Sequence, residues 1–199
     1  MEDEVLIGGI EKRRIYLVEY DPSWPKIFIE HERRIRNALG SKTSAVEHVG
    51  STSVPGLAAK PIIDIIVVVA DSGKEDTYLP QLVGAGYILR VREKDWHQHR
   101  MFRTPELDVH IHIFSEGCPE ILRQVAFRNR LRNVAVDRLL YESVKRELVA
   151  RGWEDMNAYA REKSSVVEEI TARALQAPAT PVPVSSAIER AKQSGQQPT

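Results

Sequence analysis

One aspartate interrupts the longest apolar run of the chain, and this residue constrains the fold more than any other. The run, 62–70, reads Ile-Ile-Asp-Ile-Ile-Val-Val-Val-Ala, with Asp64 near its start. Consecutive β-branched residues are typical of a strand that is covered on both faces. Because a carboxylate buried without a partner is costly, the pattern predicts one of two environments for Asp64. It has a structural salt bridge, or it binds a metal or a basic ligand at an opening of the sheet.

The composition indicates one globular domain and excludes several classes of protein. The 199 residues are 42% hydrophobic and 28% charged, which is unlike a disordered chain. Lys plus Arg and Asp plus Glu number 28 each, so the net charge indicates neither nucleic acid nor a membrane as partner. The single cysteine, Cys118, excludes an intramolecular disulfide, and we expect it to be a buried small side chain. With an acidic start and an apolar run shorter than the roughly 20 residues of a membrane span, the protein is expected to be cytoplasmic.

Alternating patterns predict an α/β (α+β) fold, in which a mixed sheet is followed by a C-terminal helical bundle. Ser23 and Gly40 bound the first predicted helix, whose apolar residues recur at helical spacing. Strands are predicted over 45–49, 62–69, 87–91, 100–103 and 107–114, and a helix over 74–83 lies between the second and the third. Three more helices are predicted over 119–132, 137–151 and 155–175.

The chain is expected to divide into three segments. Residues 1–14 form a frayed N-terminus, and residues 15–176 form the folded domain. Residues 177–199 are rich in proline, glutamine and serine. Such a composition buries too little apolar surface to offset the entropy of ordering, so this tail is predicted to be disordered.

The loop between the first two predicted strands has the composition of a phosphate-binding loop. Gly50 allows the backbone to approach a ligand closely. The hydroxyl groups of Ser51, Thr52 and Ser53 can bind phosphate oxygens, and Lys60 can neutralise their charge. The same residues are also typical of an ordinary tight turn, so the loop alone leaves both interpretations open.

The predicted strand 107–114 places three polar side chains on one face. Asp108, His110 and His112 alternate with apolar residues, and successive side chains of a strand point to opposite faces. Two imidazoles at this spacing, with Asp64 facing them, suit a divalent metal. The alternative is a partly solvated strand face whose histidines form structural hydrogen bonds.

Basic side chains recur on the predicted C-terminal helices. Arg128 and Arg132 are four residues apart, so both face the same way and could grip a triphosphate. A solvated face with ion pairs is the alternative. Two Tyr-x3-Lys pairs follow, Tyr141 with Lys145 and Tyr159 with Lys163. Lys145 and Lys163 either line a cleft or extend over the core.

Three further histidines have no clear pattern. His48 lies next to the hydroxyl-bearing loop and is a further candidate for the site. His97 and His99 lie in the charged segment Asp-Trp-His-Gln-His-Arg, which we interpret as a surface turn. These last two are expected to be structural or solvated.

Taken together, these segments resemble the GrpB or UPF0157 family, which is assigned to the nucleotidyltransferase superfamily. The likeness extends over about 20–175, and its most specific part is the segment 47–64. The matching stretches are Tyr-Asp-Pro-Ser-Trp-Pro at 20–25, Glu-His-Val-Gly-Ser-Thr-Ser-Val-Pro-Gly-Leu-Ala-Ala-Lys-Pro-Ile-Ile-Asp at 47–64, Gly-Tyr at 86–87, His-Ile-His at 110–112, Phe-Arg-Asn-Arg-Leu-Arg at 127–132 and the two Tyr-Lys pairs.

The resemblance implies where a nucleotide and its metal would bind. Gly50 and Ser51 match the Gly-Ser that binds the nucleotide's phosphates, and Asp64 matches the first metal carboxylate. Asp108 best matches a carboxylate on a later strand, so Asp64 and Asp108 are the expected catalytic residues. The superfamily pattern then asks for a second acid two residues after the first, and here that position is Ile66.

We therefore expect a metal-dependent enzyme that transfers a nucleotidyl or phosphoryl group from an NTP to a small acceptor. Its cofactor would be Mg²⁺ or Mn²⁺, with Asp64, His110 and His112 as metal ligands. Because Ile66 replaces a carboxylate, a second hypothesis is a non-catalytic domain on the same fold. Such a domain would bind a nucleotide, another phosphorylated small molecule or a protein.

Overall fold

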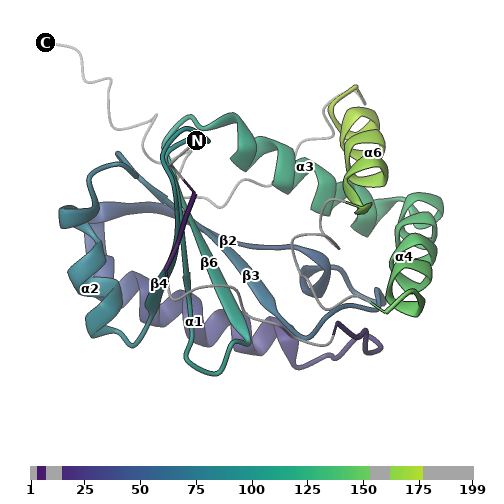
Figure 1. The fold of residues 1–199 in the computed structure, drawn as a ribbon, viewed down its shortest axis with the longest axis horizontal. Helices are drawn as coiled ribbons and strands as arrows, with labels where there is room; N and C mark the ends of the chain where they lie inside the picture. Colours follow the sequence, from purple (N-terminus) through teal and green to yellow (C-terminus); the bar gives the residue numbers. More distant parts are fainter. Residues whose placement is uncertain (1–3, 8–14, 153–161, 177–199) are drawn as a thin grey trace, which may run out of the picture.

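A mixed six-stranded sheet forms the centre of the protein. The computed structural model describes residues 4–7, 15–152 and 162–176. The strand order is β1-β4-β5-β6-β3-β2; β3 and β6 are parallel, and the other neighbouring pairs are antiparallel. The strands are β1 (Glu4–Leu6), β2 (Thr43–Val49), β3 (Ile63–Val69), β4 (Ile88–Glu93), β5 (His99–Arg103) and β6 (Val109–Ser115). The predicted α/β class is thus confirmed (Figure 1).

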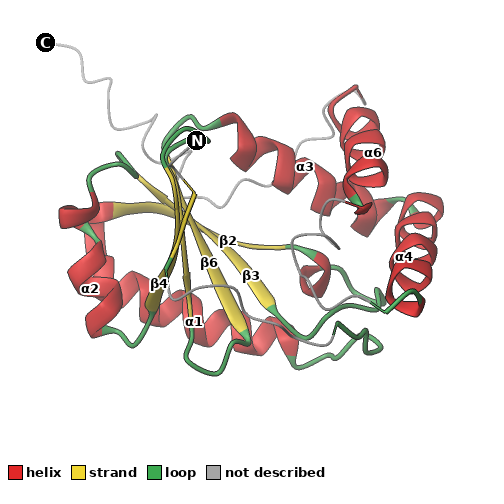
Figure 2. Ribbon diagram, viewed as in Figure 1, coloured by secondary structure: helices red, strands yellow, loops and turns green. Residues whose placement is uncertain are grey.

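Helices cover both faces of the sheet. Figure 2 shows α1 (Trp24–Leu39) and α2 (Leu79–Gly84) on one face and α3 (Pro119–Asn133) on the other. β3 is accordingly buried on both sides. Ile65 and Val67 belong to the core under α1, whereas Ile66 and Val68 pack with residues of α3. The helical spacing of apolar residues predicted for this helix is confirmed, since Trp24, Ile35 and Leu39 lie on its buried face together with His31.

The C-terminal helices pack on one another beside the sheet, as predicted. α4 (Ala135–Ala150) and α6 (Ser164–Gln176) share an apolar cluster with α3 that includes Leu131, Tyr141 and Ile170. A buried aspartate also joins the three helices. Asp137 of α4 lies 2.6 Å from Arg130 Nε of α3 and 2.9 Å from Arg173 Nη2 of α6. Among the described residues, no helix is long and apolar enough to cross a membrane.

The predicted helix over 74–83 is wrong in its first half. The structure has a short 3₁₀ helix, Glu75–Thr77, and α2 begins only at Leu79. Tyr78 between them has φ −139° and ψ −25°, and its buried hydroxyl donates a hydrogen bond to the Ser72 carbonyl. Pro80 has no N–H to bond to the preceding turn, so one continuous helix would lose a hydrogen bond there.

The prediction for the N-terminus also needs a correction. Residues 4–6 are not frayed but form β1, which pairs with β4 in the register Glu4 to Glu93. An edge strand such as β4 has unpaired backbone groups, and pairing with β1 satisfies them. Residues 1–3, 8–14, 153–161 and the predicted tail 177–199 lie outside the described residues, as does Tyr159.

Candidate functional site

Asp64 lies at an opening of the sheet. It is the second residue of β3, opposite Val49 of β2 and His110 of β6. Its side chain is on the face of the sheet that is covered by α3, yet it remains 32% exposed. Its neighbours Ile63 and Ile65 are buried in the core on the α1 face. The acidic residue is tolerated because its own side chain lies at the opening, on the opposite face.

Two histidines of β6 contact the Asp64 carboxylate. His110 Nδ1 lies 3.5 Å and His112 Nε2 lies 3.7 Å from Asp64 Oδ1. One donor atom from each of the three residues lies within 4.8 Å of the other two. Withdrawal from water acts to raise the pKa of the Asp64 carboxyl, but the two imidazoles outweigh it and hold the pKa well below its ordinary value. The structure thus brings together the three side chains predicted as metal ligands.

Asp108 does not join this group. It precedes β6, its side chain is exposed, and its carboxylate accepts a hydrogen bond from Thr104 Oγ1. Within the described residues, the cluster of donor atoms suited to a metal consists of Asp64, His110 and His112. The catalytic role of Asp108 stays a prediction.

The donor set does not fit Mg²⁺. Magnesium prefers oxygen ligands in octahedral geometry, whereas this cluster offers one carboxylate and two imidazoles. Ile66, where the resemblance implied a second carboxylate, is fully buried beside Val49, Val68 and Phe114. An acidic side chain there would lie inside an apolar cluster.

His99 is a neighbour of the site that the sequence prediction missed. It is not in a surface turn but begins β5, and it is buried. Its Nε2 lies 3.0 Å from His112 Nδ1, and its Nδ1 contacts Glu93 Oε2. Burial lowers the pKa of His99 to about 4, although Glu93 acts to raise it. A sequence signal for His99 does exist. If the strands 100–103 and 107–114 are paired as a hairpin and the pairing is extended by one residue, His99 lies opposite Phe114 and near His112.

Gly50 joins β2 to the hydroxyl-bearing loop and touches Asp64. Its φ is +68°, in the left-handed region that glycine adopts readily. A Cβ atom on Gly50 would lie 2.4 Å from Asp64 Oδ2. The close approach predicted for this glycine therefore includes a contact with the carboxylate of β3.

The three loop hydroxyls have different surroundings. Thr52 and Ser53 are buried and donate to the carbonyls of Ile62 and Gly50, respectively. Ser51 is only half-buried, and its Oγ accepts a hydrogen bond of 3.2 Å from Lys145 Nζ. Of the hydroxyls predicted to bind phosphate, Ser51 is thus the one that the loop leaves accessible.

Lys145 of α4 is held beneath this loop. It is 2% exposed, it donates to the Ala58 carbonyl as well as to Ser51, and its Nζ lies 4.7 Å from the centre of the Tyr141 ring. Burial lowers its pKa to about 7, and repulsion from Lys163 and Lys60 acts in the same direction, while Glu142 opposes it. The nearby positive charges of Lys60 and Lys163 thus disfavour a proton on Lys145.

Arg128 and Arg132 hold protein atoms of the same region. Arg128 donates to the carboxylate of Glu47 and to the carbonyl of His48. Arg132 donates twice to the carbonyl of Ser53. Both arginines therefore fix the strand and loop around Gly50, and their predicted contacts with a triphosphate stay predictions.

His48 lies on the other face of the sheet from Asp64. Its ring stacks on Phe28 of α1, and its Nε2 lies 3.1 Å from Thr52 Oγ1. Burial lowers its pKa to about 4, and Arg132 and Arg128 contribute to this lowering. Its place under α1 gives it a packing role.

A known protein family matches the part of the chain that contains this region. The sequence profile of the GrpB protein family matches residues 14–173, which include all the site residues described above. The chain belongs to the GrpB family. The resemblance seen in the sequence is thereby confirmed.

Relatives of this GrpB-family chain cover most of its length. A UPF0157 protein of Halalkalibacterium halodurans is 51% identical over 86% of this chain and 89% of the relative. A UPF0157 protein of Streptomyces coelicolor is 50% identical over 85% of this chain and 89% of the relative. The crystal structure of the conserved protein GrpB from Enterococcus faecalis has a TM-score of 0.73 and 34% identity, over 81% of this chain and 98% of that one. The fold of this GrpB-family protein is therefore shared with a solved structure.

Proposed function

We propose that this protein binds the phosphate groups of a nucleotide or of another phosphorylated small molecule at the Gly50–Ser51 loop. We further propose that it transfers a nucleotidyl or phosphoryl group to a small acceptor with the help of a divalent cation at Asp64. The observation that carries the proposal is the position of this loop. Asp64 touches it at Gly50, and Lys145 touches it at Ser51.

The charges around the loop support an anionic ligand. Lys163 and Lys60 are close enough to Lys145 for their positive charges to lower its pKa, so each repels the charged form of Lys145. An anion beside Ser51 would relieve this repulsion. Phosphate is a suitable anion, because backbone N–H groups, hydroxyls and ammonium groups bind its oxygens well.

The arrangement also supports a ligand that extends from the lysines to Asp64. Gly50 and Ser51 are adjacent in the chain. A ligand phosphate bound by the Ser51 hydroxyl would therefore lie one residue away from the contact between Gly50 and Asp64. A cation at Asp64 would supply charge neutralisation to the same phosphate chain. In transfer from an NTP, the acceptor oxygen would bond to the α-phosphorus as the bond to the leaving pyrophosphate breaks.

A second candidate function is binding without turnover. It is favoured by Ile66, because this residue removes one of the carboxylates that two-cation transfer requires. A protein that binds a phosphorylated ligand with one cation needs no second carboxylate.

Thermal unfolding with each of the four NTPs tests the binding step. A ligand present at 100 times its dissociation constant stabilises the folded protein by about 2.7 kcal/mol. We expect such a shift for wild type and its loss in Ser51→Ala and Lys145→Met. Ser143→Ala is the matched control, because Ser143 is an exposed residue of α4. If no NTP and no inorganic triphosphate stabilises wild type, the proposed phosphate site is wrong.

Pyrophosphate release separates the two candidates. The stabilising NTP is incubated with the protein and with a small-molecule extract as the source of acceptors. Release that depends on Lys145 supports transfer, whereas saturable binding without release supports the second candidate.

A further inference from the structure

Four polar side chains form a row across four adjacent strands. Glu93 of β4 lies opposite His99 of β5, and its carboxylate contacts His99 Nδ1. His99 Nε2 lies 3.0 Å from Nδ1 of His112 on β6, and the two rings are inclined by only 16°. His112 Nε2 then faces Asp64 of β3 at 3.7 Å. The row ends at the cluster of donor atoms described above.

The contacts of Glu93 and His99 suit one tautomer of His112. An ionised carboxylate only accepts hydrogen bonds, so Nδ1 of His99 carries the proton that it donates to Glu93. In a neutral ring Nε2 of His99 is then an acceptor, and it can accept a hydrogen bond from Nδ1 of His112 in the tautomer that leaves Nε2 of His112 for a metal. In that tautomer the Nε2 lone pair of His112, 3.7 Å from Asp64 Oδ1, is available to a cation in the cluster.

The distances in the cluster match donors that share one ion. The separations of 3.5 Å and 3.7 Å between Asp64 Oδ1 and the two imidazoles are at or beyond the limit for a hydrogen bond. Two ligand atoms, each about 2.1 Å from a tetrahedral metal, stand about 3.4 Å apart. A cation between them would be bound by the carboxylate and by both imidazoles.

We infer that Asp64, His110 and His112 bind a divalent transition metal such as Zn²⁺ or Co²⁺ in preference to Mg²⁺, and that His99 and Glu93 are positioning residues for this metal. Imidazole is a good ligand for these metals, whereas Mg²⁺ prefers oxygen. Metal-binding histidines usually donate their second N–H to an outer partner, which fixes the ring and its tautomer. His99 has this relation to His112. The inference rests on the cation site of the proposed function and specifies its metal.

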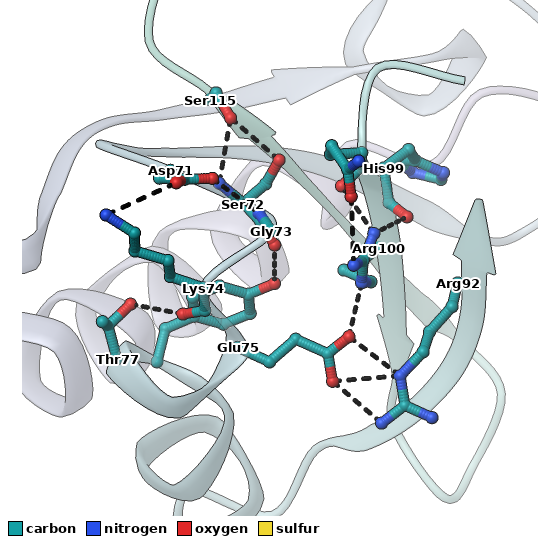
Figure 3. A network of polar contacts seen from close by, with 12 residues as sticks. Asp71, Ser72, Gly73, Lys74, Glu75, Thr77, Arg92, His99, Arg100 and Ser115 are labelled. Carbon is teal, nitrogen blue, oxygen red and sulfur yellow. Dashed lines mark hydrogen bonds and ion pairs between the residues drawn. The ribbon is translucent and has the colours of Figure 1, made fainter. Parts of the chain in front are cut away.

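The protein holds His99 from both faces of the sheet. Its ring stacks on Phe114 with centroids 4.8 Å apart. On the other face, Arg100 donates to the His99 carbonyl and binds Glu75, which also binds Arg92 (Figure 3). Because Arg100 is buried, this network fixes the start of β5 and with it the ring that contacts His112.

Metal binding is measured on the metal-free full-length protein without any nucleotide. Equilibrium dialysis against Zn²⁺ or Mg²⁺ gives the stoichiometry and affinity, and visible absorption of added Co²⁺ reports its coordination. We expect one Zn²⁺ per chain, displacement of Co²⁺ by Zn²⁺, and Mg²⁺ binding that is at least about 100-fold weaker. Asp64→Asn is expected to abolish the binding of Zn²⁺ and Co²⁺ at this site.

Two substitutions of the same residue test the positioning role. His99→Leu removes the acceptor for His112 and is expected to weaken Zn²⁺ binding about 10- to 100-fold and to change the Co²⁺ spectrum. His99→Gln can accept from His112 and donate to Glu93, so it is expected to restore most of the affinity. Glu93→Ala changes a second, partly exposed residue of the row. It is expected to weaken Zn²⁺ binding about tenfold. Thermal unfolding without metal checks that each variant folds.

The inference is overturned if wild type binds neither Zn²⁺ nor Co²⁺, or if Mg²⁺ binds as tightly. Equal Zn²⁺ affinity in wild type, His99→Leu and Glu93→Ala would overturn the positioning role. Because these measurements contain no phosphate, they fail or succeed independently of the NTP experiments. Metal binding without NTP binding would leave this inference intact and refute the proposed function.

Discussion

Gly50 packs so closely on Asp64 that a single added methyl group would lie 2.4 Å from Asp64 Oδ2. This contact joins the loop that bears Ser51 to the strand that bears the carboxylate. The position of the loop therefore depends on a residue without a side chain.

Gly50→Ala is expected to destabilise the protein by more than a positive φ alone explains. Gly56→Ala is the matched control, because Gly56 has φ +76° and no atom within 4 Å of an added Cβ. The control should lose about 1 to 2 kcal/mol of unfolding free energy, and Gly50→Ala at least about 1 kcal/mol more through the clash. Chemical denaturation measures both. Equal losses would show that the loop can move away from Asp64 at no cost.

Lys145 is expected to make the stability depend on pH above neutrality. Its pKa is about 7 in the folded protein, whereas the ordinary value, expected in the unfolded chain, is 10.5. Between pH 7 and pH 10.5 the unfolded chain therefore binds a proton that the folded protein does not. The free energy of unfolding contributed by Lys145 therefore rises as the pH rises from 7 to 10.5. Denaturation across this range should show the slope in wild type and in Lys74→Met, whose side chain is 70% exposed. Lys145→Met should reduce it, and an unchanged slope would contradict the lowered pKa.

His48 is expected to destabilise the protein in acid. Burial lowers its pKa from 6.5 to about 4, so between these values the unfolded chain takes up a proton that the folded protein excludes. Its contribution, about 3 kcal/mol, is present above pH 6.5 and is lost as the pH falls toward 4. His48→Gln should flatten this part of the stability curve. A remaining slope is expected from His31 and His99, whose pKa values are also lowered.

Asp137 is expected to be essential for the packing of the three C-terminal helices. Its side chain is 6% exposed and pairs with Arg130 and Arg173. Asp137→Ala leaves two guanidinium groups without this partner and should cost about 3 to 5 kcal/mol of unfolding free energy. Glu169→Ala is the control, because Glu169 binds the same Arg173 but is 61% exposed, so its loss should be below about 1 kcal/mol. Similar losses in the two variants would contradict a special role for Asp137.

Local periodicity was enough to predict most elements and to single out the three side chains that the structure brings together at Asp64. The alternation in 107–114 places His110 and His112 on one face, and an acidic residue in a β-branched run identifies Asp64 as unusual. These patterns depend on neighbours in the sequence, which is why they can be read without a structure. The prediction failed for the N-terminal half of the helix over 74–83. The buried hydroxyl of Tyr78 and the missing N–H of Pro80 interrupt the helix there, although the apolar spacing is helical.

The outer parts of the site depend on tertiary contacts that no local pattern encodes. His99 looks like a turn residue until β5 pairs with both β4 and β6. Lys145 reaches Ser51 only because α4 packs beside the loop after β2. β1 was likewise missed, since three residues become a strand only when the edge of β4 is available.

The parallel pairing of β3 with β6 also determines when the candidate site can form. Asp64 and His110 become neighbours only after the chain has passed through α2, β4 and β5. Such distant pairings carry a high entropic cost of loop closure and tend to form slowly. A metal ion that needs both residues has no complete site during the early steps of folding. Bound metal is therefore expected to lengthen the lifetime of the folded protein by slowing unfolding, while leaving the rate of refolding unchanged.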